Sequence, residues 1–172
     1  MRVLREIIVT LTIAMAMFIA LQFTIQSSVV VGSSMEPNLQ NGQRLVVSKV
    51  AYAFHEPARG DVVIFHPPSS RRTEYIKRII GLPGDTVEIK NGRVIVNGEL
   101  LEESYIDNPP LYTMSQQVVP DNSYFVLGDN RNNSNDSHNW GAVNRESIVG
   151  KGWISIWPPD DWGTIPNYLL SE

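Results

Sequence analysis

Residues 87–96 read VEIKNGRVIV, and this stretch predicts a β-hairpin. Two short alternating runs, 87–90 and 93–96, flank the pair Asn91-Gly92. An Asn-Gly pair suits a two-residue type I′ turn because both residues accept positive φ. Similar short apolar runs, bounded by Gly, Pro or Asp, occur at 46–47, 62–65, 76–80, 124–127 and 153–157. The sequence therefore predicts a mainly β, partly barrel-like unit, with a short helical turn near 50–54 and a Pro-containing excursion at 108–117.

The N-terminal region contrasts with this pattern, because residues 7–35 contain no charged side chain. Its apolar part, 7–25, reads IIVTLTIAMAMFIALQFTI, and 19 helical residues at about 1.5 Å each span roughly a bilayer core. Arg2 and Arg5 precede this run, and the next basic residue is Arg44. By the positive-inside rule, residues 1–6 are cytoplasmic, 7–25 form a transmembrane anchor and 26–172 lie outside. A cleaved signal peptide and a buried core helix are the alternatives.

The overall composition excludes several classes of function. The chain has 172 residues, 14 Lys+Arg against 18 Asp+Glu, a net charge of −4 and no cysteine. An acidic balance gives no general attraction to nucleic acid, so we expect no nucleic-acid partner. The absence of cysteine excludes disulfides, thiolate nucleophiles and Cys-based zinc sites. Nucleophilic chemistry must therefore use Ser, Thr, Lys or a carboxylate.

Two short segments carry candidate chemistry. Residues 32–37 read GSSMEP, with two serines in a Gly/Pro-bounded turn that could equally be an ordinary loop. Lys77 and Arg78 lie in YIKRIIG, where strand alternation sends them to opposite faces, so one of the two cations must point to the more buried side. A buried lysine loses its charge more easily and can act as a general base. The alternative is a lysine that extends to the surface.

The segment 128–138 reads GDNRNNSNDSH and is dense in Asp, Asn and Ser. A calcium loop is unlikely to be its role, because twelve residues from Asp129 lies Trp140 rather than a bidentate Glu, and the sixth position is not Gly. Side-chain bonds that brace a loop are the more typical use of these residues. A triad of Ser34, His138 and Asp136 is an alternative that only geometry can decide.

Taken together, these segments resemble bacterial type I signal peptidases, the membrane-anchored peptidases of family S26 that use a Ser/Lys dyad. The resemblance begins with the anchor and residues 32–37, which match the Ser-Met-x-Pro box of the family. It continues through 59–65 (RGDVVIF) and 75–85 (YIKRIIGLPGD). It ends with 128–137, followed by Trp140-Gly141. Four boxes in order behind an anchor are far more specific than any one of them.

The resemblance implies a fold and an active site. The fold is a signal-peptidase-like β-barrel or coiled β-sheet catalytic domain behind one N-terminal transmembrane helix, in which 99–118 form at most a minimal cap. Ser34 is then the nucleophile, neutral Lys77 the general base and Ser134 the residue that orients the lysine. The Ser34 N–H forms part of the oxyanion hole, and Met35 lies beside the nucleophile and the cleft.

Further residues take supporting roles by the same resemblance. Gly32 stands where some relatives place a hydroxyl donor to the oxyanion, so a backbone group or Ser33 must serve, or the hole is one donor weaker. The remaining residues of the boxes imply an ionic scaffold formed by Arg78, Asp129, Arg131 and Asp136. His138 stands where some relatives carry Arg, which puts an ion pair with Asp136 in doubt near neutral pH.

The activity implied is cleavage of N-terminal signal peptides from exported preproteins, after small residues of the Ala-x-Ala type, through an acyl-enzyme. The implied partners are preprotein signal peptides, the lipid bilayer and a neighbouring secretion translocon, with no cofactor and no metal. The implied location is the bacterial inner or plasma membrane with the catalytic domain on the outer face, or else a thylakoid membrane. An inactive membrane-tethered binding protein and a self-cleaving repressor-type peptidase are the alternatives.

An aromatic cluster lies near the C-terminus. Trp153 and Trp157 share a face under period-two alternation, which predicts that they fill the core. For Trp162 a core position and a place at the bilayer interface are equally consistent with the sequence.

Overall fold

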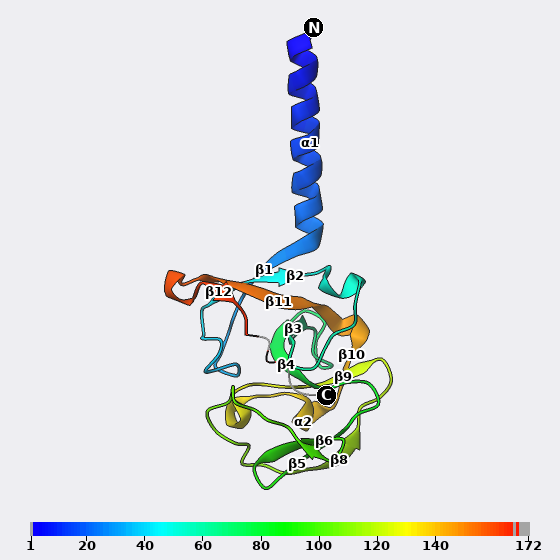
Figure 1. The fold of residues 1–172 in the computed structure, drawn as a ribbon, viewed down its shortest axis with the longest axis vertical. Helices are drawn as coiled ribbons and strands as arrows, with labels where there is room; N and C mark the ends of the chain where they lie inside the picture. The colour runs from blue at the N-terminus through cyan, green and yellow to red at the C-terminus, as the bar shows by residue number, and fades with distance from the viewer. Residues whose placement is uncertain (1, 167, 169–172) are drawn as a thin grey trace.

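The computed structural model describes residues 2–166 and 168. It begins with one long helix, α1 (Arg2–Thr24), which projects from a β-rich body (Figure 1). The strands that follow are β1 (Ile25–Val29), β2 (Arg44–Ser48), β3 (Val62–Phe65), β4 (Tyr75–Gly81), β5 (Thr86–Lys90), β6 (Arg93–Val96), β7 (Glu99–Leu100), β8 (Met114–Val118), β9 (Ser123–Leu127), β10 (Val143–Asn144), β11 (Ile148–Trp157) and β12 (Gly163–Thr164). The short helix α2 (Ser137–Trp140) and four 3₁₀ turns, Ala51–Ala53, Arg131–Asn133, Arg145–Ser147 and Pro159–Asp161, complete the elements.

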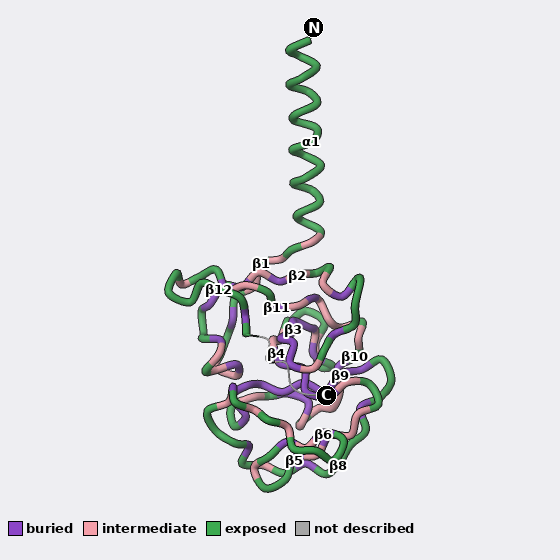
Figure 2. Tube along the Cα trace, in the orientation of Figure 1, coloured by how far each residue is buried: buried purple, intermediate pink, exposed green. Residues whose placement is uncertain are grey.

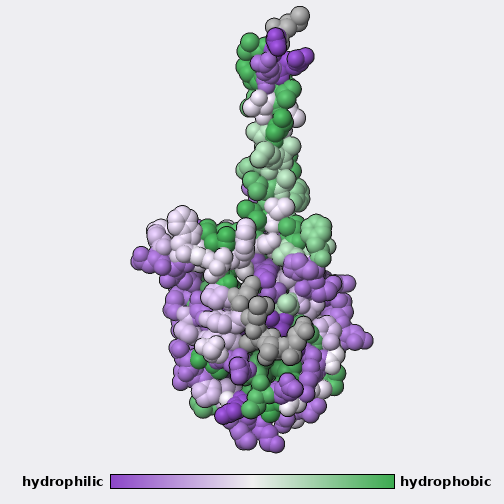
Figure 3. All heavy atoms as spheres, viewed as in Figure 1, coloured by the Kyte–Doolittle hydropathy of each residue, from purple (hydrophilic) through white to green (hydrophobic). Residues whose placement is uncertain are grey.

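The helix α1 has the properties of a membrane span. It is 23 residues long with a mean hydropathy of 2.2 over its most apolar window, and none of that window is buried in the protein. Its hydroxyl side chains bond back to its own backbone, as Thr10 Oγ1 donates to Glu6 O and Thr12 Oγ1 to Ile8 O. A polar group in lipid needs such an internal partner. Figure 3 shows hydrophobic side chains along the helix, hydrophilic ones at its N-terminal end and a largely hydrophilic body.

All strand pairs are antiparallel, and they form two sheets. The larger sheet has the order β1-β2-β11-β3-β4-β9-β10, with β12 also paired to β11. It curls into a half-barrel, as the sequence and its resemblance predicted for the fold (Figure 1). The smaller sheet, β7-β6-β5-β8, lies at the end of the molecule remote from α1.

The hairpin with which the sequence analysis began is confirmed. β5 pairs with β6 in the expected register, Lys90 opposite Arg93, and Asn91 and Gly92 adopt φ of 52° and 72°. The predicted excursion after it is more ordered than expected, because β8 returns to pair with β5 and Met114 is buried there. A core of nine buried residues joins the two sheets: Ile80, Val87, Ile89, Val94, Val96, Met114, Val119, Phe125 and Leu127.

A second and a third core fill the half-barrel itself, as the buried trace in the body shows (Figure 2). The third core matters most for function, since it lies under the segment that follows β1. Its buried members are Val30, Met35, Leu39, Leu45, Val62 and Ile165.

The prediction that Trp153 and Trp157 fill the core is wrong. Their exposed fractions are 51% and 54%, and Trp162 is 71% exposed. Small residues take the inward positions of β11 instead. At Gly150, for example, there is no room for a side chain, because an added Cβ would clash with the carbonyl oxygen of Ser48. Register shifts in the β11–β2 pairing also break the simple alternation on which the prediction rested.

The helix leads into the sheet without a linker. β1 starts at Ile25, directly after Thr24, and Lys49 N donates to Thr24 O at 2.9 Å, which ties the end of α1 to β2. The nucleophile candidate Ser34 therefore lies ten residues beyond the helix. Two of the predicted segments, 1–6 and 26–172, include residues outside the described part of the chain. These residues are 1, 167 and 169–172.

Candidate active site

The segment 30–39 positions Ser34. Its beginning is tied to the neighbouring turn, as Val30 N donates to Gln43 O at 2.8 Å and Gly42 N to Val30 O at 2.9 Å. Immediately after Ser34, Met35 is fully buried in the third core, and Leu39 N donates back to Met35 O at 2.9 Å. Burial of Met35 fixes the turn from below and leaves the Ser34 side chain above it. Met35 thus supports Ser34 from the core and does not line the cleft described below.

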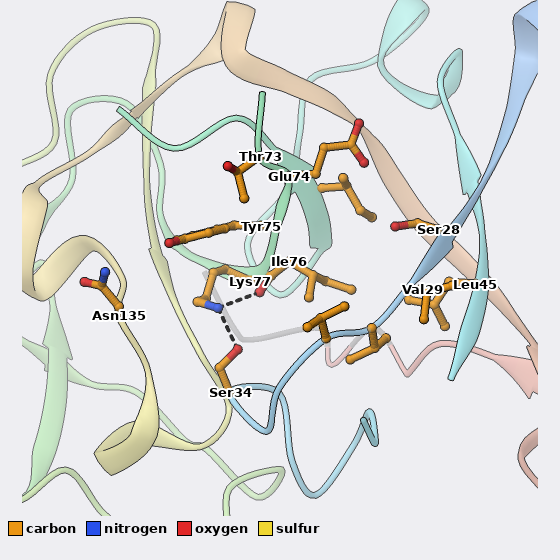
Figure 4. Close-up of a pocket in the computed structure, with 13 residues that line it drawn as sticks. Ser28, Val29, Ser34, Leu45, Thr73, Glu74, Tyr75, Ile76, Lys77 and Asn135 are labelled. Carbon is orange, nitrogen blue, oxygen red and sulfur yellow. Dashed lines mark hydrogen bonds between the residues drawn. The ribbon is translucent and has the colours of Figure 1, made fainter. Parts of the chain in front are cut away.

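Lys77 comes from β4 and meets Ser34 directly. Lys77 Nζ lies 2.7 Å from Ser34 Oγ and 2.8 Å from the carbonyl oxygen of Ile76, as the dashed lines in Figure 4 mark. The residue is 4% exposed. Burial lowers the pKa of Lys77 to about 8, although the negative charges of Asp136 and Asp129 act in the opposite direction. A lysine in this state is available as a base near neutral pH. Ser34 Oγ is therefore bonded to a lysine and not to His138.

Arg78, the next residue along β4, is buried as well, with an exposed fraction of 0%. The sequence predicted that one of these two neighbouring cations faces the more buried side, whereas the structure buries both. Arg78 Nε and Nη2 donate to the two carboxylate oxygens of Asp129 at 2.8 and 2.7 Å, and Nη1 donates to Gly60 O at 2.8 Å. Both faces of β4 are covered at this point, one by the dyad and the other by this ion pair.

The loop after β9 packs against Ser34. Asn130 N donates to Ser34 O at 3.0 Å, and a Cβ at Gly128 would lie 2.5 Å from Ser34 O and 2.3 Å from Ser134 Oγ. Only glycine allows this close approach. Ser134 Oγ is buried, and no hydrogen-bond partner is found for it among the described residues. The structure thus brings Ser134 next to the Ser34 turn but does not form a hydrogen bond from it to Lys77.

The other members of the expected scaffold find separate partners. Arg131 Nη1 donates to Glu103 Oε2 at 2.6 Å, and its Nη2 pairs with the other oxygen of Glu103. The Asp136 carboxylate accepts from His138 Nδ1 at 2.6 Å, and this contact is an ion pair only when His138 is protonated. Glu103 was missed by the sequence analysis because it lies 28 residues away in a stretch without a recognisable motif.

The turn before Ser34 contains Gly32 and Ser33, the residues expected on the oxyanion side. Gly32 is exposed with φ of 88°, and its N–H donates to Asn41 Oδ1 at 2.9 Å. The hydroxyl of Ser33 accepts from Asn133 Nδ2 at 2.8 Å, while the Ser33 carbonyl accepts from Asn130 Nδ2 at 3.2 Å. These bonds hold the turn, and Asn130 and Asn133 are two supporting residues that the motif alone did not single out.

A cleft of about 320 Å³ opens in front of the dyad. One wall comes from β1 and the residues after it, the other from the start of β4, and Ser34 and Lys77 lie at its end (Figure 4). The residues that line it are Ser28, Val29, Val30, Val31, Ser34, Leu45, Ile64, Thr73, Glu74, Tyr75, Ile76, Lys77 and Asn135. Across residues 2–166 and 168, no group of three or more His, Asp or Glu side chains is placed to hold a metal ion.

The chain is similar in sequence to known proteins. The family model "Signal peptidase, peptidase S26" matches residues 3–157. The chain belongs to this family. Signal peptidase I of Leptolyngbya laminosa is 42% identical over 170 residues, which cover 91% of this chain and 84% of that protein. Probable signal peptidase I-1 of Synechocystis sp. is 41% identical and covers 97% of this chain and 89% of its own.

A solved structure agrees with the fold. The crystal structure of a signal peptidase I from Enterococcus faecalis matches with a TM-score of 0.51 at 32% identity, over 56% of this chain and 96% of that chain. The chain is thus a serine peptidase of the signal peptidase family, a hydrolase that cleaves signal peptides, with an apolar N-terminal helix that suits a membrane-associated protein.

Proposed function

We propose that this chain cleaves preproteins after Ala-x-Ala-type sites with Ser34 as nucleophile and Lys77 as general base. The observation that carries the proposal is the 2.7 Å separation of Lys77 Nζ and Ser34 Oγ at the end of a cleft. The lowered pKa of Lys77, about 8, supports it because a neutral amine is needed to take the serine proton.

The reaction proceeds in two steps. Neutral Lys77 Nζ accepts the Ser34 proton as Oγ attacks the scissile carbonyl, and the oxyanion forms beside the Ser34 N–H. The tetrahedral intermediate collapses when Lys77 returns the proton to the leaving amine, which leaves an acyl group on Ser34. A water then gives a proton to Lys77 and attacks the ester, and the proton returns to Ser34 Oγ as the acid product leaves. Ser134 orients the lysine amine in this scheme.

The free edge of β4 supports binding of the substrate as an extended strand. On its other side, residues 75–78 of β4 pair with β3, whereas the pairing of β4 with β9 begins only at Arg78. Residues 75–77, which line the cleft together with the segment 29–31, therefore have no strand partner on that side in the part of the chain that the structure describes. A substrate strand laid between the two walls gains backbone hydrogen bonds from this edge. The apolar walls formed by Val30, Leu45, Ile64 and Ile76 leave room for small side chains such as Ala.

The membrane arrangement follows from the helix. With Arg2 and Arg5 at its N-terminal end, α1 is oriented with that end in the cytoplasm and the catalytic domain on the outer face of a bacterial plasma membrane or in a thylakoid. The exposed residues Trp153, Trp157 and Trp162 suit the headgroup region near the helix exit. The dyad then lies close to the bilayer, where a signal peptide leaves a translocon.

The proposal is tested on a purified preprotein with an Ala-x-Ala site in detergent. Wild type is expected to cleave it, with the cut position read by mass spectrometry. Ser34→Ala and Lys77→Ala are expected to lose activity by at least about 10³-fold, whereas Lys90→Ala, which changes an exposed lysine on β5, is expected to cleave normally. Cleavage that persists in either dyad variant would disprove the assignment. Lack of turnover by folded wild type would instead support an inactive binding protein.

A further inference from the structure

Asp136 links the loop after β9, which packs against Ser34, to His138, a residue that the proposed reaction does not use. The residue is fully buried at the start of α2. Its Oδ2 accepts from Gly128 N at 2.9 Å, and its Oδ1 accepts from His138 N at 3.3 Å and from His138 Nδ1 at 2.6 Å. Gly128 is the residue at which an added Cβ would clash with Ser34 O and Ser134 Oγ. One carboxylate therefore connects the backbone behind the nucleophile with the imidazole of His138.

The contact fixes the tautomer of His138. Because a carboxylate only accepts hydrogen bonds, Nδ1 carries a proton, and Nε2 is the nitrogen that gains or loses one. The side chain is 15% exposed, so solvent reaches its edge. One ring face stacks on Tyr112, with ring centroids 4.0 Å apart and planes 20° apart. The imidazole is thus held against Asp136 in both of its charge states.

Of the charged and titratable groups around His138, the neighbours keep a fixed charge, whereas His138 can be neutral or protonated. Burial raises the pKa of Tyr112, so the stacked phenol stays neutral. Behind Tyr112, Arg131 and Glu103 form a buried ion pair whose charges cancel. On the side of the dyad, Asp129 is matched by Arg78, which is always charged. Asp136 is matched only when His138 is protonated.

The pKa of Lys77 depends on the charge of the Asp136–His138 pair. The negative charge of Asp136 is the first of two that raise the pKa of Lys77 against the effect of burial. When His138 is neutral, the Asp136–His138 pair carries a charge of −1 and favours the lysine ammonium. When His138 is protonated, the pair is neutral and the ammonium loses that support.

We propose that His138 is a positioning residue that controls the protonation of Lys77 through Asp136. Protonation of His138 keeps Lys77 in its neutral, reactive form to lower pH, and so extends activity to the acid side. This inference rests on the proposed function, in which Lys77 is the base. It assigns to His138 an electrostatic role in addition to its hydrogen bonds to Asp136, the N-cap residue of α2.

The first test compares two substitutions of the same residue. His138→Arg places a permanent positive charge beside Asp136, and His138→Gln keeps a donor without charge. The acid limb of kcat/KM against pH is expected to lie about 0.5 to 1 pH unit lower in the Arg variant than in the Gln variant. Wild type is expected to lie between them. The same two changes at His55, which is exposed, are expected to leave the limb unmoved.

A reciprocal measurement does not need activity or a tolerated change at His138. In a Ser34→Ala background, the ring resonances of His138 are titrated by NMR with Lys77 present and with Lys77→Met. Removal of the lysine charge is expected to move the midpoint for His138 up by about the same 0.5 to 1 unit, because coupling between two sites is reciprocal. The midpoint for His55 is expected to stay fixed.

The outcomes separate the two proposals. Coincident acid limbs for His138→Arg and His138→Gln, or a His138 midpoint that ignores Lys77→Met, would overturn the coupling. Cleavage by Lys77→Ala would overturn the dyad instead, and the NMR titration would still report whether the two residues are coupled.

Discussion

Lys77 and Arg78 are adjacent on β4 and equally hidden from solvent, yet they are set up for opposite purposes. Arg78 donates two parallel hydrogen bonds to Asp129 and a third to Gly60 O. Among the described residues, the hydrogen bonds of Lys77 go to two neutral oxygens, those of Ser34 and Ile76. The arginine is therefore a compensated charge, whereas the lysine is an uncompensated one whose pKa burial lowers to about 8.

The difference shows how one strand provides both stability and reactivity. A buried ion pair with well-formed hydrogen bonds is costly to break, because either partner alone is left charged without water. A buried lysine without a carboxylate partner is instead neutralised easily. The side of β4 that faces Asp129 holds the loop after β9, and the side that faces Ser34 carries the lysine that we propose as the base.

The largest effect is expected from Arg78→Met. This change leaves the buried Asp129 carboxylate without its partner, which typically costs about 3–5 kcal/mol. Urea unfolding in detergent is expected to show that loss at pH 7. Arg93→Met, at an exposed position of the hairpin, is the matched control and is expected to change stability by less than about 0.5 kcal/mol. A similar, small change in both variants would mean that the ion pair does not hold the loop.

Lys77→Met, the same substitution one residue earlier, is expected to increase the free energy of unfolding, whereas Arg78→Met decreases it. The folded-state pKa of Lys77, about 8, is below the ordinary value of 10.5, so folding favours the neutral amine. The unfolded chain binds more protons between these two values, and stability therefore rises with pH from about 8 to 10.5. Below pH 8 the buried ammonium costs about 3 kcal/mol at about 1.4 kcal/mol per unit.

Lys77→Met removes this cost and also the base. It is expected to be more stable than wild type at pH 6–7 by up to about 3 kcal/mol, with the gap closing above pH 10. Chemical denaturation across this pH range measures the gap directly. A destabilised Lys77→Met protein at pH 7 would show that the lysine is a structural cation like Arg78.

The smallest effect on folding is expected from Ser134→Ala. The Ser134 hydroxyl is buried without a partner among residues 2–166 and 168, so its removal is expected to change stability by no more than about 1 kcal/mol. If Ser134 orients Lys77 during turnover, kcat falls by about 10²-fold, as misplacement of a catalytic group does. Unchanged kcat, with KM also unchanged, would remove Ser134 from the proposed mechanism.

Local signals explain which parts of the fold could be predicted. The Asn91-Gly92 hairpin depends on two residues with positive φ, and the helix depends on a continuous apolar run, so each is determined by its own sequence. Ser34 and Lys77 lie 43 positions apart, and only their motifs suggested that they meet. The roles proposed for them remain predictions until the variants are measured.

Features that depend on what covers a surface were not predictable. Alternation placed Lys77 and Arg78 on opposite faces of β4, but it could not show that both faces are covered. It likewise placed Trp153 and Trp157 on one face of β11 without showing that small residues fill the other face and leave the rings exposed. The Glu103 partner of Arg131 needed the folded chain for the same reason.

The protonation of Lys77 itself is the most direct test of the account. NMR of protein labelled at its lysines, with the Lys77 signal assigned by its loss in Lys77→Met, gives the pH at which this amine titrates. We predict a midpoint near 8, as burial of the amine implies. A midpoint above 10 would contradict the claim that Lys77 is the base that activates Ser34.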